Sequence, residues 1–140
     1  MLLSVAICTR DRAASLRRTL ASLAECARAS DPWEVLVVDN GSRDDTPAAA
    51  AAFEGTLPVR VIHEAAPGLS NARNAAVREA RGAYIVWTDD DCLPARDWLS
   101  AYAAAFRAEP DAAVFGGPIV PRFEGEPPGW LTRVAARVGT

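Results

Sequence analysis

The sequence predicts an α/β fold in which a mainly parallel sheet is covered by helices on both faces. Short apolar segments alternate along the chain with segments whose apolar residues recur at helical spacing. The apolar segments are hydrophobic at almost every position, which is typical of parallel strands buried on both sides. A length of 140 residues suits one domain with a single core. We therefore expect consecutive strand–helix units in one sheet.

The first two units each begin with an apolar run. Residues 2–8 predict a buried strand, and residues 12–28 predict an amphipathic helix with Asp11 placed to cap its start. Residues 34–39 are rich in valine and predict the second strand. A turn-rich segment follows that strand. A helix is expected from Thr46, because the proline after it is tolerated in a first helical turn.

The next two units follow the same plan. Residues 59–63 predict a strand, and residues 70–81 predict a helix closed by Gly82. Residues 83–87 predict the fourth strand, after which Pro94 is expected to open another helix. The apolar stripe of that helix consists of Trp98, Leu99, Tyr102 and Phe106.

The pattern weakens after residue 111. Residues 112–115 and 119–120 predict short strands. Residues 121–130 are rich in proline and glycine and predict a loop, and residues 130–138 predict an amphipathic helix. We therefore expect one domain over residues 1–120, followed by a segment of different character over residues 121–140.

Composition excludes several classes of function. The 15 basic residues are all arginine and 18 residues are acidic, so the net charge is −3 and no nucleic-acid-binding surface is expected. Three widely spaced cysteines and one histidine argue against a zinc site and a disulfide framework, and favour a reducing compartment. No apolar run approaches the roughly 20 residues that cross a bilayer, and the first residues do not resemble a signal peptide. We expect a cytoplasmic protein.

The sequence also lacks two common nucleotide-binding motifs. It contains no lysine, so the phosphate-binding loop of P-loop proteins is excluded. No GxGxxG follows the first predicted strand, so a dinucleotide-binding site is not expected.

Polar side chains follow the predicted strands at the point where each strand ends. These groups are residues 9–11, 39–42, 63–64 and 89–91. In an open parallel sheet, ligands bind beyond the carboxyl ends of the strands. Carboxylates gathered in one crevice raise one another's pKa unless a cation lies between them. The sequence therefore predicts a metal ion at this edge.

Asp89, Asp90 and Asp91 are the strongest indication of such a site. If strand geometry continues through them, Asp89 and Asp91 point to one side and hold one cation, while Asp90 meets a ligand hydroxyl. Mg²⁺ and Mn²⁺ prefer oxygen ligands, and Mg²⁺ commonly combines one or two carboxylates with substrate phosphates. These residues predict a diphosphate held through Mn²⁺ or Mg²⁺. The alternative is a solvated acidic turn that caps the helix expected at Pro94.

For other candidates the residues by themselves leave two interpretations open. Asp39 either accepts hydrogen bonds from a base or ribose, or stabilises a turn. Thr9 and Arg10 either meet a nucleotide, or form a turn in which the arginine pairs with the next residue. Arg73 either counters phosphate charge or is a solvated helical arginine. His63 is interpreted as part of the strand end.

Four blocks of sequence go further than these single residues. They are SVAICTRDR at residues 4–12, VVDNGSRDDT at 37–46, GLSNARN at 68–74 and TDDD at 88–91. In this order and spacing they resemble the inverting glycosyltransferases of family 2, which have the nucleotide-sugar-binding GT-A fold. The last block stands in the place of that family's DXD motif. A single DXD motif is weak evidence, whereas four ordered blocks are strong evidence.

The resemblance implies a metal-dependent transferase of glycan biosynthesis, which moves a sugar from a nucleoside-diphosphate sugar to a hydroxyl acceptor with inversion. A UDP-sugar is the favoured donor. Asp39 would bond the base, Thr9 and Arg10 would line the base and ribose pocket, and Arg73 would lie near the nucleotide. The acceptor glycan, lipid or other compound is unknown.

For the acidic block, the resemblance implies that Asp89 or Asp90 approaches the ribose and that Asp91 holds the metal. The metal would stabilise charge on the departing nucleoside diphosphate. The sequence departs from the family in having Arg10 where many members have an aromatic residue, so a cation–π or charge contact would replace a stack on the base.

The family's general base, an Asp or Glu, has no match in this sequence and is expected beyond Thr140. We therefore expect residues 1–120 to bind the nucleotide sugar, residues 121–140 to begin the acceptor side, and the chain to bind its donor without efficient transfer. Membrane association is expected only through sequence beyond Thr140. Two rival hypotheses are a non-catalytic nucleotide- or metal-binding module and a nucleotidyltransferase.

Overall fold

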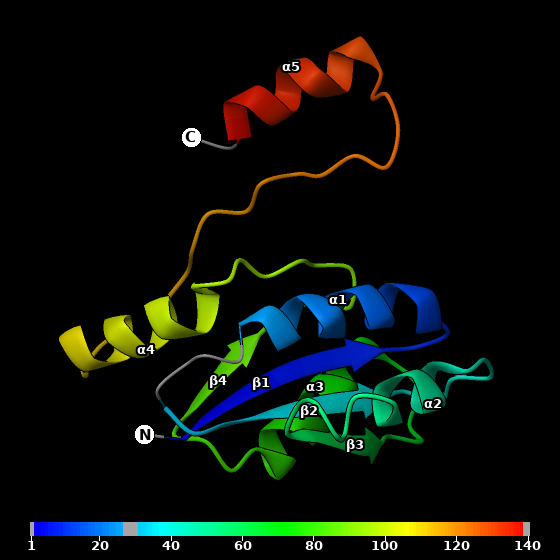
Figure 1. Cartoon of the computed structure of the whole chain (residues 1–140), viewed down its shortest axis with the longest axis vertical. Coiled ribbons are helices and arrows are strands. Elements are labelled where there is room, and N and C mark those ends of the chain that lie inside the picture. The colour runs from blue at the N-terminus through cyan, green and yellow to red at the C-terminus, as the bar shows by residue number, and fades with distance from the viewer. Residues whose placement is uncertain (1, 27–30, 139–140) are drawn as a thin grey trace. The chain divides into compact units, whose positions relative to one another are not determined.

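The computed structural model describes residues 2–26 and 31–138, apart from the side chains of residues 133 and 135–138. The chain divides into two compact units, Met1–Pro110 and Asp111–Thr140, and each is described by itself. The first unit contains a four-stranded sheet in the order β3-β2-β1-β4, in which every pair of neighbours is parallel (Figure 1). The predicted α/β fold with a parallel sheet is confirmed.

The four strands follow the predicted apolar runs. They are β1 (Leu3–Thr9), β2 (Trp33–Asp39), β3 (Val59–His63) and β4 (Tyr84–Trp87). Their register aligns the last residues of β1, β2 and β3, so that Thr9 lies beside Asp39 and Asp39 beside His63. The fourth strand stops earlier, because its last residue pairs with Ala6. The carboxyl edge of the sheet therefore gathers polar residues next to a short β4.

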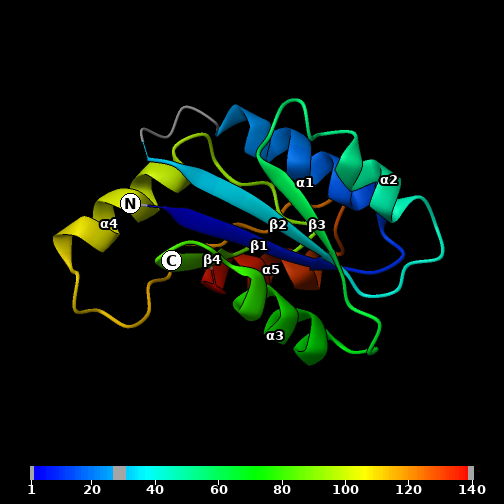
Figure 2. The ribbon, with the colours of Figure 1, turned by 90° about the horizontal axis from the view of Figure 1, so that it is seen from below.

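Helices cover both faces of this sheet, as predicted. Figure 2 shows α1 (Ala13–Glu25) and α2 (Thr46–Ala51) on one face and α3 (Leu69–Glu79) on the other. Leucines 16, 20 and 23 of α1 are fully buried. On the opposite face, Ala6 and Val38 of the sheet form a buried cluster with three alanines of α3. These small side chains let the helix approach the strands closely.

The helix α4 (Trp98–Ala108) lies beside β4. Tyr84 of that strand stacks on Phe106, with ring centroids 4.1 Å apart and an angle of 5° between the ring planes. The prediction that Pro94 opens this helix is wrong, because the helix begins four residues later. The carbonyl oxygen of Pro94 instead accepts a hydrogen bond from the hydroxyl of Ser22 on α1, at 2.9 Å.

The start of α1 differs from the prediction in the residue that caps it. The Ala13 N–H donates to Oδ2 of Asp44, at 3.1 Å, so a carboxylate from the loop after β2 satisfies this helix end. Asp11 adopts a left-handed backbone with φ of 53°. Its Oδ1 accepts from the Arg43 N–H instead. The predicted cap by Asp11 is therefore wrong, and the last predicted residues of this helix, 27–28, lie outside the described part of the chain.

The helix α3 ends at Glu79 and its C-cap Ala80 is extended, so the predicted closure by Gly82 is wrong. Gly82 serves a different purpose. A Cβ atom there would come within 2.5 Å of the Ser4 backbone nitrogen, and its own N–H donates to the Ser4 hydroxyl at 2.8 Å. Glycine at this position lets the chain cross closely over the start of β1.

The second unit contains the helix α5 (Gly129–Val138), which confirms the predicted C-terminal helix. The short strands predicted at residues 112–115 and 119–120 are absent from the structure, which is irregular there. Apolar sequence alone does not form a strand without a neighbouring strand to pair with, and Val114 is 86% exposed. Among the described residues, no helix is both long and apolar enough to span a membrane.

Candidate functional site

The order of the strands creates a crevice at the carboxyl edge of the sheet. From β1 the chain moves outward to β2 and β3, and it then returns to place β4 on the other side of β1. In parallel sheets a ligand site forms where the strand order reverses in this way. A cavity of about 450 Å³ lies there. Its lining includes six of the seven residues selected from the sequence, namely Thr9, Arg10, Arg73, Asp89, Asp90 and Asp91.

Asp39, the seventh, is not part of the cavity lining. Its side chain is buried, and its Oδ1 accepts a hydrogen bond from the Ser42 N–H at 3.1 Å. Its Oδ2 lies 3.3 Å from Nδ1 of His63 at the end of β3. In the structure this carboxylate therefore stabilises the turn after β2, and the next residue, Asn40, lines the cavity.

The three consecutive aspartates lie in two different environments. The strand does not continue through them, because β4 ends at Trp87 and the chain turns at Asp90 and Asp91. Asp90 is 5% exposed and points inward, where its Oδ2 accepts from the Thr9 hydroxyl at 2.7 Å. Burial raises the pKa of the Asp90 carboxyl, although the Thr9 hydrogen bond and the nearby Arg12 charge oppose that effect.

Asp89 and Asp91 are exposed and face a common point. A carboxylate oxygen of each and the sulfur of Cys92 all lie within 4.8 Å of one another. Two carboxylates offer the oxygen donors that Mn²⁺ and Mg²⁺ prefer, whereas a thiol sulfur suits softer ions. The donor set therefore fits a hard divalent cation held by the two aspartates.

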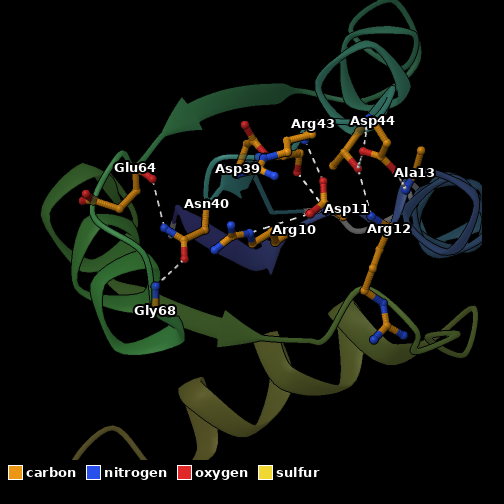
Figure 3. A network of polar contacts seen from close by, with 12 residues as sticks. Arg10, Asp11, Arg12, Ala13, Asp39, Asn40, Arg43, Asp44, Glu64 and Gly68 are labelled. Atoms are coloured by element: carbon orange, nitrogen blue, oxygen red, sulfur yellow. Dashed lines mark hydrogen bonds and ion pairs between the residues drawn. The ribbon is translucent and has the colours of Figure 1, made fainter.

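Arg12 is a site residue that the sequence analysis missed. Its Nε lies 3.0 Å from Oδ1 of Asp90, and its Nη2 donates to Oδ2 of Asp91 at 2.8 Å. Figure 3 shows its side chain turned away from the contacts that Asp11 and Asp44 make. An arginine at the start of a helix resembles ordinary solvated surface in sequence. The available signal was its place inside the first family-like block.

Asn40 was also missed, and it fixes the loop that leads into α3. Its Nδ2 donates to the carbonyl oxygens of Glu64 and Ala66, at 2.9 and 2.7 Å. Its Oδ1 accepts from the Gly68 N–H at 2.7 Å (Figure 3). Gly68 has a φ of 125°, which favours glycine. A side-chain amide directly after a buried strand was the signal in the sequence.

Arg10 lies in the loop after β1, with its Nε 3.7 Å from Oδ2 of Asp11. Two hydrogen bonds from backbone N–H groups to side-chain oxygens hold this loop against the turn after β2. The Asp11 N–H donates to the Ser42 hydroxyl at 2.9 Å. The Arg43 N–H donates to Oδ1 of Asp11 at 2.6 Å (Figure 3). The Arg10 side chain is exposed and lines the cavity, while hydrogen bonds hold the backbone of its loop in place.

The other wall of the cavity is positive. It contains Arg73 and the start of α3, including Gly68 and Leu69. The N-terminus of a helix attracts anions, because its free N–H groups and the helix dipole point there. Burial raises the pKa of the neighbouring Cys8 thiol to about 11, while the charge of Arg73 acts in the opposite direction. The cavity thus combines carboxylates after β4 with a positive wall at α3.

Comparison with known proteins assigns the family. Residues 4–137 match the family described as Glycosyl transferase family 2. The chain belongs to this family. It is 33% identical over 118 residues to validoxylamine A glucosyltransferase from Streptomyces hygroscopicus, covering 83% of this chain and 28% of that protein. It is 32% identical over 116 residues to the hyaluronan synthase of Pasteurella multocida, covering 81% of this chain and 12% of that protein.

Solved structures agree with the family. The mannosyltransferase PcManGT from Pyrobaculum calidifontis, in complex with GDP-Man and Mn²⁺, is 33% identical with a TM-score of 0.67, covering 74% of this chain and 32% of that one. The S. aureus protein TarS in complex with UDP has a TM-score of 0.71 at 24% identity, covering 86% of this chain and 39% of that one, and supports the fold. This family member therefore spans well under half the length of these relatives.

Proposed function

We propose that this chain forms the donor-binding part of a glycosyltransferase that uses a nucleoside-diphosphate sugar with Mn²⁺ or Mg²⁺. The observation that carries the proposal is the cavity at the strand-order reversal, whose lining contains both Asp89 and Asp91 and also Arg73 with the start of α3. This lining suits a diphosphate. The negative charge of a diphosphate attracts a cation held by the carboxylates, and it also attracts the positive groups at the start of α3. The relative crystallised with GDP-Man and Mn²⁺ supports this choice of ligand.

In this proposal each element at the cavity has a defined task. Thr9 ends β1 and Arg10 follows it, and both line the pocket for base and ribose. Asp39 lies beside Thr9 in the sheet register but outside the cavity lining, so its contact with the edge of the base is proposed on the family resemblance alone. The start of α3 and Arg73 hold the phosphates.

The acidic residues act at the leaving group. Asp89 and Asp91 hold the divalent cation, and Asp90 keeps this segment in place through its contact with Thr9. A bound cation would stabilise the charge that develops on the departing nucleoside diphosphate. We propose a UDP-sugar as donor and transfer with inversion, on the family resemblance of the four blocks.

We also place the reaction in the cytoplasm. The supporting observation is that Cys8, Cys26 and Cys92 are all free in the structure. Unpaired cysteines are typical of proteins in a reducing compartment.

Calorimetric titration with UDP and GDP, in Mn²⁺ and in EDTA, tests the donor site. We expect UDP to bind in the presence of Mn²⁺. Asp91→Ala should weaken UDP binding at least about tenfold, because replacing even a side chain that only hydrogen-bonds to a metal ligand commonly weakens metal binding by that factor. Asp97→Ala is the matched control, because this exposed aspartate lies outside the cavity lining and makes no capping hydrogen bond. Absence of nucleotide binding, or equal binding by Asp91→Ala and the wild type, would contradict the proposal.

A further inference from the structure

Arg12 forms ion pairs with the acidic segment of residues 89–91. Its Nη2 lies 2.8 Å from Oδ2 of Asp91, and its Nε lies 3.0 Å from Oδ1 of Asp90. Asp90 is buried, whereas Asp91 is 52% exposed in its side chain. The guanidinium therefore joins a fixed internal carboxylate to an accessible one that belongs to the candidate metal pair.

This contact competes with a divalent cation. A metal ion held by Asp89 and Asp91 would lie close to a guanidinium that already neutralises Asp91, and two positive charges at that separation repel each other. The Nε contact with Asp90 is separate from the Nη2 contact with Asp91. Arg12 is half exposed and also lines the cavity, so its outer nitrogens can leave Asp91 while Nε keeps the side chain in place.

We propose that Arg12 disfavours binding of a free divalent cation and favours binding of a cation together with a nucleoside diphosphate. This inference rests on the proposed donor site. The negative charge of the diphosphate attracts both the guanidinium and the divalent cation, so the two positive charges can lie close together when the diphosphate is bound. A guanidinium released from Asp91 then donates to a phosphate oxygen, for which its planar fork is well suited. Arg12 acts here as a specificity-determining residue for the metal–nucleotide pair.

Titration with Mn²⁺ alone, followed through the electron paramagnetic resonance signal of free Mn²⁺, tests this role. We expect Arg12→Gln to bind Mn²⁺ about three- to tenfold more tightly than the wild type, since a partly exposed ion pair is lost and a positive charge is removed. For UDP in saturating Mn²⁺ we expect the opposite, a weakening of about three- to tenfold. Arg12→Lys keeps the positive charge. The affinity of this variant for Mn²⁺ without nucleotide should therefore stay within about twofold of the wild-type affinity.

Arg96→Gln is the charge-matched control. Arg96 pairs with Glu25 at the far end of α1 and does not line the cavity. A gain in Mn²⁺ affinity of equal size in this variant would overturn the role of Arg12, and so would an unchanged or lower Mn²⁺ affinity of Arg12→Gln. UDP binding by the wild type separates the two proposals. If UDP does not bind, the donor site itself is wrong, whereas UDP binding with equal Mn²⁺ affinities overturns only the role of Arg12.

Discussion

At the scale of single residues, Asp89, Asp90 and Asp91 show how one acidic run acquires different roles. The turn at Asp90 and Asp91 directs the middle carboxylate into the protein and leaves its two neighbours exposed. A buried carboxylate requires hydrogen-bond donors, because its desolvation is otherwise costly. Thr9 and Arg12 supply them. The inward aspartate thus anchors the segment that presents the other two.

The first prediction concerns the Thr9 hydroxyl. Thr9→Val keeps the shape of the side chain but leaves Oδ2 of Asp90 without this donor. We expect a loss of about 1–3 kcal/mol in the free energy of unfolding, measured by urea denaturation. Thr9→Ser restores a hydroxyl and should recover most of that loss. Equal stability of the valine and serine variants would show that the hydrogen bond contributes nothing.

At the scale of elements, the amino ends and the carboxyl ends of the parallel strands have different roles. At the amino edge, Oε1 of Glu34 on β2 accepts from the hydroxyl of Ser4 on β1 at 2.7 Å and from the Arg81 N–H at 2.8 Å. Its Oε2 accepts from Nε of Arg60 on β3 at 3.0 Å. This network joins three strands to the segment before the fourth. The carboxyl edge, in contrast, directs several of its polar groups toward a cavity.

The second prediction follows from the pKa of Glu34. Burial raises this pKa, but the hydrogen bonds from Ser4 and Arg81 and the charge of Arg60 outweigh burial and leave it below the ordinary value of 4.5. A carboxyl with a lowered folded-state pKa stabilises the protein above its unfolded-state pKa, and this stabilisation is lost as the pH falls through the folded value. Glu34→Gln should therefore cost about 1–3 kcal/mol at neutral pH and progressively less below pH 4.5.

Urea denaturation across this pH range measures the effect. Glu54→Gln replaces an exposed glutamate and should change the free energy of unfolding by less than about 0.5 kcal/mol at any pH. A cost of Glu34→Gln that stays constant as the pH falls would rule out a role for the ionised carboxylate.

At the scale of the whole molecule, the described hydrophobic core lies in the first unit. Its buried apolar side chains run from Leu3 to Phe106, and the cavity lining runs from Cys8 to Asp91. In the second unit several apolar residues are largely exposed, among them Ile119 and Val120. Folding of the first unit therefore draws on contacts within residues 1–110.

The third prediction is that a chain ending at Pro110 folds by itself. Because the described core is retained, we expect cooperative thermal unfolding with a Tm within about 5 °C of that of the 140-residue chain, which corresponds to about 1 kcal/mol. Circular dichroism on both chains provides the comparison. Non-cooperative unfolding of the shorter chain would show that residues 111–140 complete the fold.

The predictions from sequence succeeded where neighbouring residues in the chain determine the structure. They failed where contacts with residues far along the chain determine it. Strand β3 was predicted residue for residue, because a run of branched apolar residues between turn signals has few alternatives. The cap of α1 was wrong, because the residue that caps it lies 31 positions along the chain. Gly82 was misassigned for the same reason, since the close approach to Ser4 joins residues 78 positions apart.

The sequence by itself determined the parallel α/β architecture, the family and the list of polar residues at the strand ends, because periodicity and ordered motifs are properties of the chain. The tertiary structure decided which of these residues share a cavity and which way each one faces. It buried Asp39 and Asp90 and connected Arg12 to Asp91. The physical reason is that a side chain's environment depends on neighbours brought together by the strand order, and no local pattern records them.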